Sequence, residues 1–272
     1  MNILVTNDDG IGSSGILALA QAMGTIGNTF ILAPDRNWSV SGHVKTLSRP
    51  LRVNPVTLKD DIQGWTSDGS PADCVTLGAH GFFNVPIHLV VSGINTTANV
   101  GQDITCSGTV TAAMEAAIHG IPAIAFSLDT SQLNGEKPDY ESAAIWAKKV
   151  VEIALQHPFA PHSLLSVNIP ALPKDKVKGF QVTRLGSRIY YDYLDRRVDP
   201  RGLDYVWISG KEPGGINEAG TDIGALAEGY VSVTPIHLDM TAYHLMDSIN
   251  AWNWEQPEKY EINLNRLEKS CC

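Results

Sequence analysis

The sequence contains few cysteines and no long apolar run. Only four of its 272 residues are cysteine, and no two of them form a C-x-x-C pair, so neither a disulfide framework nor a zinc site is predicted. No apolar stretch approaches the roughly 20 residues that a membrane-spanning helix requires. The first residues also lack the basic segment of a signal peptide. We therefore expect a cytoplasmic protein without a membrane partner.

Basic residues are also in the minority. The chain has 20 Lys and Arg against 29 Asp and Glu, which gives a net charge of −9. A sequence-independent grip on long nucleic acid requires a basic face, so such a partner is not expected. A small substrate that carries phosphate stays open, because a bound cation inverts the local field.

Short apolar segments alternate with helical patterns through residue 170. Buried strands are predicted at residues 3–5, 30–33, 88–91, 123–126 and 164–167, and helices at 14–23, 70–80, 110–119 and 140–157. This alternation is typical of a three-layer α/β fold with a mostly parallel, Rossmann-like sheet.

The pattern changes after residue 176. Three extended segments follow, at residues 177–183, 188–194 and 205–208. They predict a β-hairpin arm over residues 177–219 that projects from a core of residues 1–176. Residues from about 220 to 240 return to complete that core, and residues 241–272 form a C-terminal helix and tail.

Polar side chains follow the predicted strands at one edge of the sheet. Asp8 and Asp9 come after the first strand, Ser39 lies in the long loop after the second, and Asn95 follows the strand that ends at Val91. Parallel strands bring these ends together. Oxygen donors of this kind suit Mg²⁺ or Mn²⁺, and two adjacent carboxylates repel each other without a cation or donors between them. The alternative is an Asx-type turn, since Asp and Gly favour turns.

A second candidate feature is the segment Ser107-Gly108-Thr109 at the start of the helix predicted at 110–119. Helix N-termini present unpaired N–H groups and bind phosphate, and Gly108 would let an oxyanion approach the backbone. A plain capped helix would have the same sequence. A hard-metal site and an anion site at one edge together indicate phosphoryl transfer to water.

Several short segments in order along the chain resemble the SurE family of metal-dependent nucleotidases. They are Thr6–Gly10, Ala33–Ser39, Gly69–Val75, Val91–Asn95, Ser107–Val110, Gly220–Asp222 and Gly229–Pro235. Members of this family hydrolyse nucleoside 5′- and 3′-monophosphates, and some also act on short polyphosphate. The resemblance covers nearly the whole chain, so it implies the same activity here.

The resemblance also assigns roles to individual residues. It implies that Asp8 and Asp9 are catalytic and bind one divalent cation per subunit, Mg²⁺ or Mn²⁺, together with Ser39 and Asn95. It implies that the substrate phosphate contacts Asn99, Ser107, Gly108 and Thr109. It further implies a homodimer or homotetramer that pairs through the arm and exchanges C-terminal segments.

Some positions stay open or depart from the family pattern. His43, in the loop near Ser39, is either a proton donor or substrate contact, or a solvated histidine. Thr97 stands where the family usually has glycine, Gln102 where an acid is common, and Cys106 where a tyrosine is common. Lys45 is unusual for the family. These departures bear on substrate preference and loop shape more than on the reaction.

Three alternatives to this function differ in chemistry. Haloacid-dehalogenase-type enzymes form an aspartyl-phosphate and carry Asp-x-Asp, whereas the acids here are adjacent, so we predict attack by water without a covalent intermediate. A dinucleotide oxidoreductase would carry G-x-G-x-x-G in the first turn, which is absent. A non-catalytic nucleotide-binding protein on the same fold remains the alternative.

The predicted arm is rich in arginine and tyrosine. The residues concerned are Arg184, Arg188, Arg196, Arg197, Arg201, Tyr190, Tyr191 and Tyr193. Nucleic-acid binding is one interpretation of such a composition. Interface formation between subunits is the one we prefer, because Arg and Tyr are enriched in protein interfaces as well.

Overall fold

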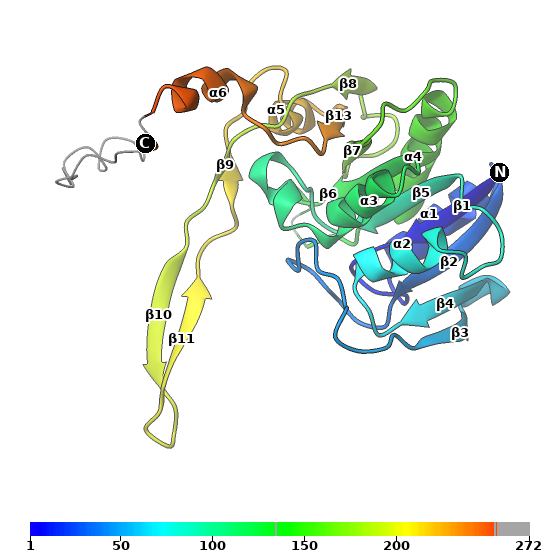
Figure 1. The fold of residues 1–272 in the computed structure, drawn as a ribbon, viewed down its shortest axis with the longest axis horizontal. Helices are drawn as coiled ribbons and strands as arrows, with labels where there is room; N and C mark the ends of the chain where they lie inside the picture. The colour runs from blue at the N-terminus through cyan, green and yellow to red at the C-terminus, as the bar shows by residue number, and fades with distance from the viewer. Residues whose placement is uncertain (134, 253, 255–272) are drawn as a thin grey trace. The chain divides into compact units, whose positions relative to one another are not determined.

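A nine-stranded sheet forms the centre of the part of the chain that the structure describes, with the strand order β3-β4-β2-β1-β5-β6-β7-β13-β8 (Figure 1). The computed structural model describes residues 1–133, 135–252 and 254. Six neighbouring strands run parallel: β4 (Gln63–Ser67), β2 (Asn28–Pro34), β1 (Asn2–Thr6), β5 (Leu89–Asn95), β6 (Ala123–Asp129) and β7 (Ser163–Pro170). The mostly parallel, Rossmann-like sheet expected from the sequence is thereby confirmed.

Both ends of the sheet depart from the parallel arrangement. At one end β3 (Val53–Thr57) runs antiparallel to β4. At the other, β13 (Val231–His237) runs antiparallel to β7 and parallel to β8 (Phe180–Val182). Strand β4 was not predicted, because its sequence Gln-Gly-Trp-Thr-Ser has no apolar run.

Strand β8 corrects the predicted extent of the arm. The sequence places residues 177–183 in the arm, whereas β8 lies at the edge of the central sheet beside β13. The Phe180 ring packs edge-on against Trp146, with 5.1 Å between the ring centroids. The Thr183 hydroxyl bonds those of Ser232 and Thr234. These partners lie far away in sequence, so a local pattern could not reveal them.

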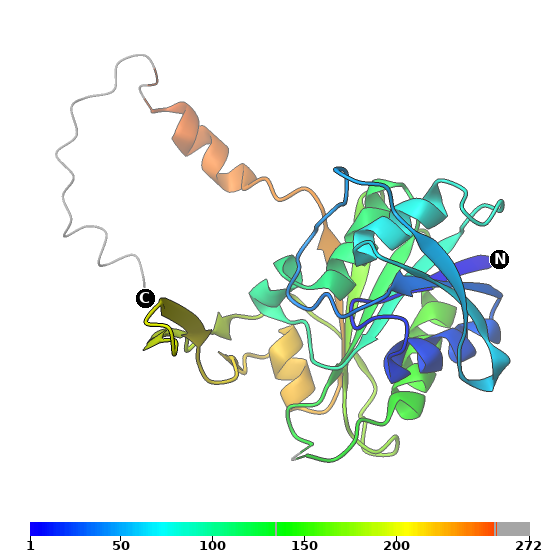
Figure 2. The ribbon, with the colours of Figure 1, turned by 90° about the horizontal axis from the view of Figure 1, so that it is seen from below.

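Helices cover both faces of the sheet and complete the three layers. The helices α1 (Ser14–Gly24) and α4 (Tyr140–Ala154) pack together on one face, and α2 (Pro71–Ala79) and α3 (Gly108–Ile118) pack together on the other (Figure 2). The start of α2 has a capping box: the Ser70 side chain accepts from the Asp73 N–H, and the Asp73 carboxylate accepts from the Ser70 N–H.

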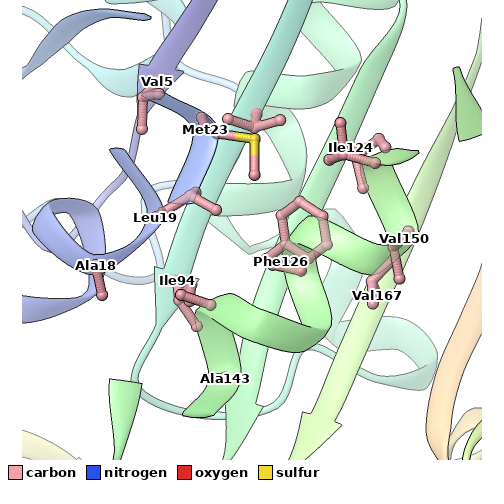
Figure 3. Close-up of a cluster of buried hydrophobic side chains, with 14 of the residues drawn as sticks. Val5, Ala18, Leu19, Met23, Ile94, Ile124, Phe126, Ala143, Val150 and Val167 are labelled. Carbon is pink, nitrogen blue, oxygen red and sulfur yellow. The ribbon is translucent and has the colours of Figure 1, made fainter. Parts of the chain in front are cut away.

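The apolar core between the sheet and the helices α1 and α4 is tightly closed. Leu19 and Met23 of α1 face Ile94 of β5 and Phe126 of β6, and all four side chains are fully buried (Figure 3). Burial of one such side chain stabilises the fold by about 1.5–3 kcal/mol. A second core on the opposite face holds α2 and α3 in place. The parallel strand ends therefore sit on a rigid base.

The arm itself is a β-hairpin of β10 (Tyr193–Val198) and β11 (Asp204–Ser209), which extends away from the sheet (Figure 1). At its base β9 (Arg188–Ile189) pairs with β12 (Gly214–Gly215). The helix α5 (Asp222–Ala227) then leads into β13. Two short 3₁₀ helices, η1 (Lys59–Asp61) and η2 (Gly101–Thr105), lie in connections.

The chain divides into two compact units, residues 1–238 and the residues from Asp239 onward. The second unit contains α6 (Tyr243–Asn250), where the sequence predicts a helix at 241–252. Residues 253 and 255–272, with most of the predicted tail and the pair Cys271–Cys272, lie outside the described residues. Among the described helices, none combines the length and apolarity that spanning a bilayer demands.

Candidate active site

Asp8 and Asp9 follow β1 in a tight turn that is made by their neighbours. The Asn7 amide nitrogen donates to the Gly10 carbonyl at 3.0 Å and to the Ser13 hydroxyl at 2.7 Å. Its amide oxygen accepts from the Gly10 N–H at 3.2 Å, while Gly10 has a φ of +96°. Asn7 and Gly10 thus form the turn. The side chains of Asp8 and Asp9 take no part in these turn hydrogen bonds.

Asp8 is buried against the start of α3. The Thr109 hydroxyl donates to its Oδ1, and a Cβ added at Gly108 would lie 2.6 Å from the Asp8 Cβ. Burial raises the pKa of Asp8, and the Thr109 hydrogen bond only partly opposes this effect. Helix α3 therefore touches the acidic pair directly, through the Thr109 hydroxyl and through Gly108, which has no side chain.

Asp9 is affected by the same environment. Burial first, and then the neighbouring charge of Asp8, raise the pKa of Asp9 to about 6. The Thr96 hydroxyl, 3.4 Å from Asp9 Oδ2, opposes the shift, and that hydroxyl also bonds Tyr140 at 3.0 Å. Within the part of the chain that the structure describes, neither carboxylate forms an ion pair.

Hydrogen bonds of their neighbours bring the segments of Ser39 and Asn95 to the acidic pair. The N–H of Trp38, next to Ser39, donates to the Asp8 carbonyl at 2.7 Å. Thr96, which follows Asn95, reaches Asp9 as described above. The Asn95 amide nitrogen donates to the Thr97 carbonyl at 2.7 Å, so the oxygen is the amide atom left for a ligand.

This donor set fits a hard divalent cation. Two neighbouring carboxylates without a cationic partner are costly to bury, and positive charge between them removes that cost. Ser39 and Asn95, whose neighbours contact the acidic pair, would add neutral oxygen ligands of the kind that Mg²⁺ and Mn²⁺ prefer. Among the described residues there is no cluster of three or more His, Cys, Asp or Glu side chains able to hold a metal. A site of two acids, a serine and an asparagine does not require such a cluster, because only two of its four residues are of these types.

The start of α3 has the form expected of an anion site. The Ser107 hydroxyl caps the helix by accepting from the Val110 N–H at 3.1 Å, and Ser107 and Thr109 are both buried. The Thr109 hydroxyl, however, is directed to Asp8. Its role thus includes orienting the carboxylate, which the sequence did not indicate.

Replacing Thr109 with valine should lower kcat/KM for a nucleotide by about tenfold, the effect of one lost hydrogen bond to a charged group. The hydroxyl that orients Asp8, and that the family resemblance assigns to the substrate phosphate, would be absent, so the inhibition constant of inorganic phosphate should rise too. Steady-state kinetics of Thr109→Val measure both values. Thr109→Ser retains the hydroxyl and should stay near wild type. An unchanged phosphate inhibition constant in Thr109→Val would contradict the phosphate contact.

Asn99 lies toward β6 and β7. Its N–H donates to the Asn168 side chain at 2.8 Å, and its amide nitrogen donates to the Ser127 hydroxyl at 2.8 Å. The Asn168 amide nitrogen returns a bond to the Asn99 carbonyl at 3.0 Å. The described hydrogen bonds of Asn99 thus fix its position at the ends of these strands without reaching Asp8 or Asp9.

His43 contacts a residue that the sequence did not single out. Its Nε2 lies 2.8 Å from Oε2 of Glu115 in α3, and Lys45 Nζ lies 2.5 Å from Oε1 of the same carboxylate. In this structure His43 is therefore exposed to solvent and paired with Glu115, and its described contacts do not reach the acidic pair. The sequence held one signal that Glu115 has basic partners. His119 follows Glu115 by four residues, and this spacing places both side chains on one face of a helix.

The departures from the family pattern lie at contacts around the site. The Thr97 carbonyl accepts from the Asn95 side chain. The Gln102 side-chain oxygen accepts from the Arg188 N–H at 2.9 Å. The Cys106 carbonyl accepts from the Gly42 N–H at 2.9 Å. Of these contacts, the one of Cys106 uses only the backbone, so the changed side chain at that position leaves the loop connection in place.

The fold and this arrangement define an α/β protein with an acidic, oxygen-lined site at the carboxyl edge of a parallel sheet, next to a helix N-terminus. The family model described as "Survival protein SurE" matches residues 3–192. The chain belongs to the SurE family, and the resemblance suggested by its short motifs is confirmed.

Individual relatives are similar over nearly their full length. "5'-nucleotidase SurE" of Chloroflexus aggregans is 44% identical over 255 residues, which cover 94% of this chain and 100% of the relative. "5'-nucleotidase SurE 1" of Thermus thermophilus is 47% identical over 252 residues, 92% of this chain and 97% of the relative. The crystal structure of SurE from Aquifex aeolicus superimposes with a TM-score of 0.79 at 42% identity, covering 92% of this chain and 98% of that one.

Proposed function

We propose that this chain is a nucleotidase that releases phosphate from nucleoside 5′-monophosphates by direct attack of water. The single observation that carries the proposal is the contact between the acidic pair and the start of α3, where Gly108 packs on Asp8 and Thr109 donates to it. An anion bound at the helix N-terminus would lie next to the cation ligands. The names of the similar proteins support the substrate class.

We propose that Asp8, Asp9, Ser39 and Asn95 hold one divalent cation, Mg²⁺ or Mn²⁺, in each subunit. When bound there, the cation would supply positive charge to the phosphate oxygens and acidify a water molecule. The protein's own groups then position the reactants. Thr109 orients the Asp8 carboxylate, and the first N–H groups of α3, with Ser107 and Gly108, receive the phosphate.

The experiment that tests this function measures phosphate release from AMP with Mn²⁺ or Mg²⁺, with and without excess EDTA. We expect turnover with metal and its loss with chelator. Turnover that persists in excess EDTA would remove the metal from the proposal. If no nucleotide is hydrolysed with metal present, the alternative of a non-catalytic nucleotide-binding protein would be favoured.

The proposal extends to 3′-monophosphates and short polyphosphate as further substrates. Both share the terminal phosphate that the start of α3 would bind, and they differ in what lies beyond it. A screen of nucleoside 5′- and 3′-monophosphates and of tripolyphosphate under one metal condition decides which of them are hydrolysed. The cytoplasmic location stays a prediction of the sequence.

We also propose that the arm joins subunits into a homodimer or homotetramer, and that subunits exchange the C-terminal segment 241–272. The arm here means the predicted residues 177–219 without β8, which lies in the central sheet. One face of the hairpin exposes aliphatic side chains, with Leu194 opposite Ile208 and Val206 opposite Arg196. A two-stranded hairpin alone is marginally stable in water, so exposed aliphatic side chains of this kind gain from a partner. Arg184, Arg188 and Arg197 pair with acids, which weakens the case for nucleic acid.

Replacing Ile208 with aspartate should shift the protein to a smaller assembly, because the charge would be buried in the contact between arms. Multi-angle light scattering after gel filtration gives the molar mass directly. Asp204→Ser, at the tip of the same hairpin, serves as the control. An unchanged mass for Ile208→Asp would argue against assembly through the arm.

A further inference from the structure

A buried carboxylate lies at the side of α3 that faces the long loop after β2. Glu115 is 1% exposed, and its two oxygens meet four donors. They are His43 Nε2 at 2.8 Å, Lys45 Nζ at 2.5 Å, Thr76 Oγ1 at 2.8 Å and His119 Nε2 at 2.9 Å. The acid pair of the active site uses none of these groups.

These donors keep Glu115 ionised. Burial alone would raise its pKa, but hydrogen bonds from His43, Lys45 and Thr76 together outweigh burial and hold the pKa well below its usual range. A buried, ionised carboxylate is stable only with such partners, and its hydrogen bonds in turn hold those partners in place.

Two of the four donors belong to the loop that carries Ser39. We call residues 38–46 of this loop the strap. Its first N–H, of Trp38, donates to the Asp8 carbonyl at 2.7 Å. In the middle, the Gly42 N–H donates to the Cys106 carbonyl at 2.9 Å, and the Gly42 carbonyl accepts from Thr111 at 3.0 Å. The strap thus runs from the acidic pair across the start of α3.

At its far end the strap is joined to the start of α2. The Val44 carbonyl accepts from the Ser70 hydroxyl at 2.5 Å, and the Thr46 N–H donates to the Asp73 carboxylate at 2.9 Å. The contacts with Glu115 lie between these two ends. They include the ion pair of the strap, between Lys45 and Glu115.

Apolar packing contributes little to the position of the strap. Val40 is 80% exposed and has a φ of +58°, and Val44 is 41% exposed. Buried polar atoms of the strap also lack partners among the described residues, at Trp38 Nε1 and Ser41 Oγ. A segment with few buried apolar contacts opens locally at low cost unless polar contacts fix it.

We infer that Glu115 is a positioning residue, which fixes the strap through His43 and Lys45 and thereby places Ser39 beside Asp8 and Asp9. The inference rests on the proposed function, in which Ser39 is a cation ligand. Glu115 lies on the helix whose first residues, Gly108 and Thr109, contact Asp8. The strap and the anion-binding helix start are therefore joined through one rigid element.

Hydrogen–deuterium exchange of the metal-free protein tests the anchoring without any need for activity. In Glu115→Gln and in Lys45→Met, amides of residues 37–46 should exchange about tenfold faster than in wild type. Those of β5, in the core, should not change. Lys148→Met removes a lysine from an exposed pair with Glu152 and is the matched control. Unchanged exchange of residues 37–46 in Lys45→Met would overturn the inference, even if Glu115→Gln does not fold.

Titration with Mn²⁺ tests the connection to Ser39. The dissociation constant for Mn²⁺ should rise about tenfold in Lys45→Met and in Ser39→Ala, as expected when a metal ligand or its support is lost. The double variant should be little weaker than Ser39→Ala, because Lys45 and Glu115 act through Ser39. A purely structural role would lower the melting temperature and leave Mn²⁺ affinity unchanged, which would overturn the inference.

The two tests separate this inference from the proposed function. If the wild-type protein binds Mn²⁺ but hydrolyses no nucleotide, the proposed nucleotidase function is wrong. The exchange and titration experiments still decide whether Glu115 positions the strap. A fully additive double variant would overturn the positioning role while the nucleotidase activity stands.

Discussion

The Asp8→Asn variant is expected to lose nucleotide hydrolysis by on the order of 10³-fold, because the proposed cation would lose one ligand charge next to the reacting phosphate. The amide retains the size of the carboxylate and can still accept from the Thr109 hydroxyl, which lies next to Asp8 Oδ1. The loss should therefore reside in kcat/KM and in Mn²⁺ binding. Initial rates with AMP and a Mn²⁺ titration measure the two effects.

Stability should not follow activity in this variant. Burial raises the pKa of Asp8, which means that the fold disfavours the charge in the absence of metal. The metal-free melting temperature of Asp8→Asn should therefore equal or exceed that of wild type. Asp129→Asn, at the carboxyl end of β6, is the matched control and should retain activity. Wild-type activity in Asp8→Asn would count decisively against the assigned site.

The Gly108→Ala variant is expected to reduce turnover by about 10²-fold, the cost of displacing a reacting group by roughly 1 Å. A methyl group here would lie 2.6 Å from the Asp8 Cβ and 2.9 Å from Oδ2, so either the helix start or the carboxylate must move. Alanine itself suits the first turn of a helix, so backbone propensity does not explain the loss.

Overpacking should also lower the stability of Gly108→Ala by about 1–3 kcal/mol, measured by thermal or denaturant unfolding. Gly12→Ala is the matched control: it lies in the turn after the acidic pair, and a Cβ there would meet nothing within 4 Å. Equal activity of the two variants would show that the close packing on Asp8 does not matter for the reaction.

Local sequence signals were sufficient for most of the core and for the acidic pair. The five buried strands and the capped helix start at Ser107 depend on neighbours within a few residues, so patterns and capping rules predict them. The placement of Asp8 and Asp9 at a strand end followed from the same rules.

Contacts between distant residues were the part that the sequence could not supply. Thr109 and Asp8 are 101 positions apart, and Lys45 and Glu115 are 70 apart. Thr109 was interpreted only as a phosphate contact, and His43 was interpreted without Glu115. The pairing of β8 with β13 is another example, because an edge strand and an arm strand share the same alternation.

The base of the arm has a consequence for how the family can vary. Strands β9 and β12 pair as Arg188 with Gly215 and Ile189 with Gly214, so the chain enters and leaves the hairpin at one point. Insertions or deletions between β9 and β12 therefore leave the pairing of β13 with β7 unchanged. If the arm joins subunits as proposed, its length can change the assembly while the central sheet keeps its geometry.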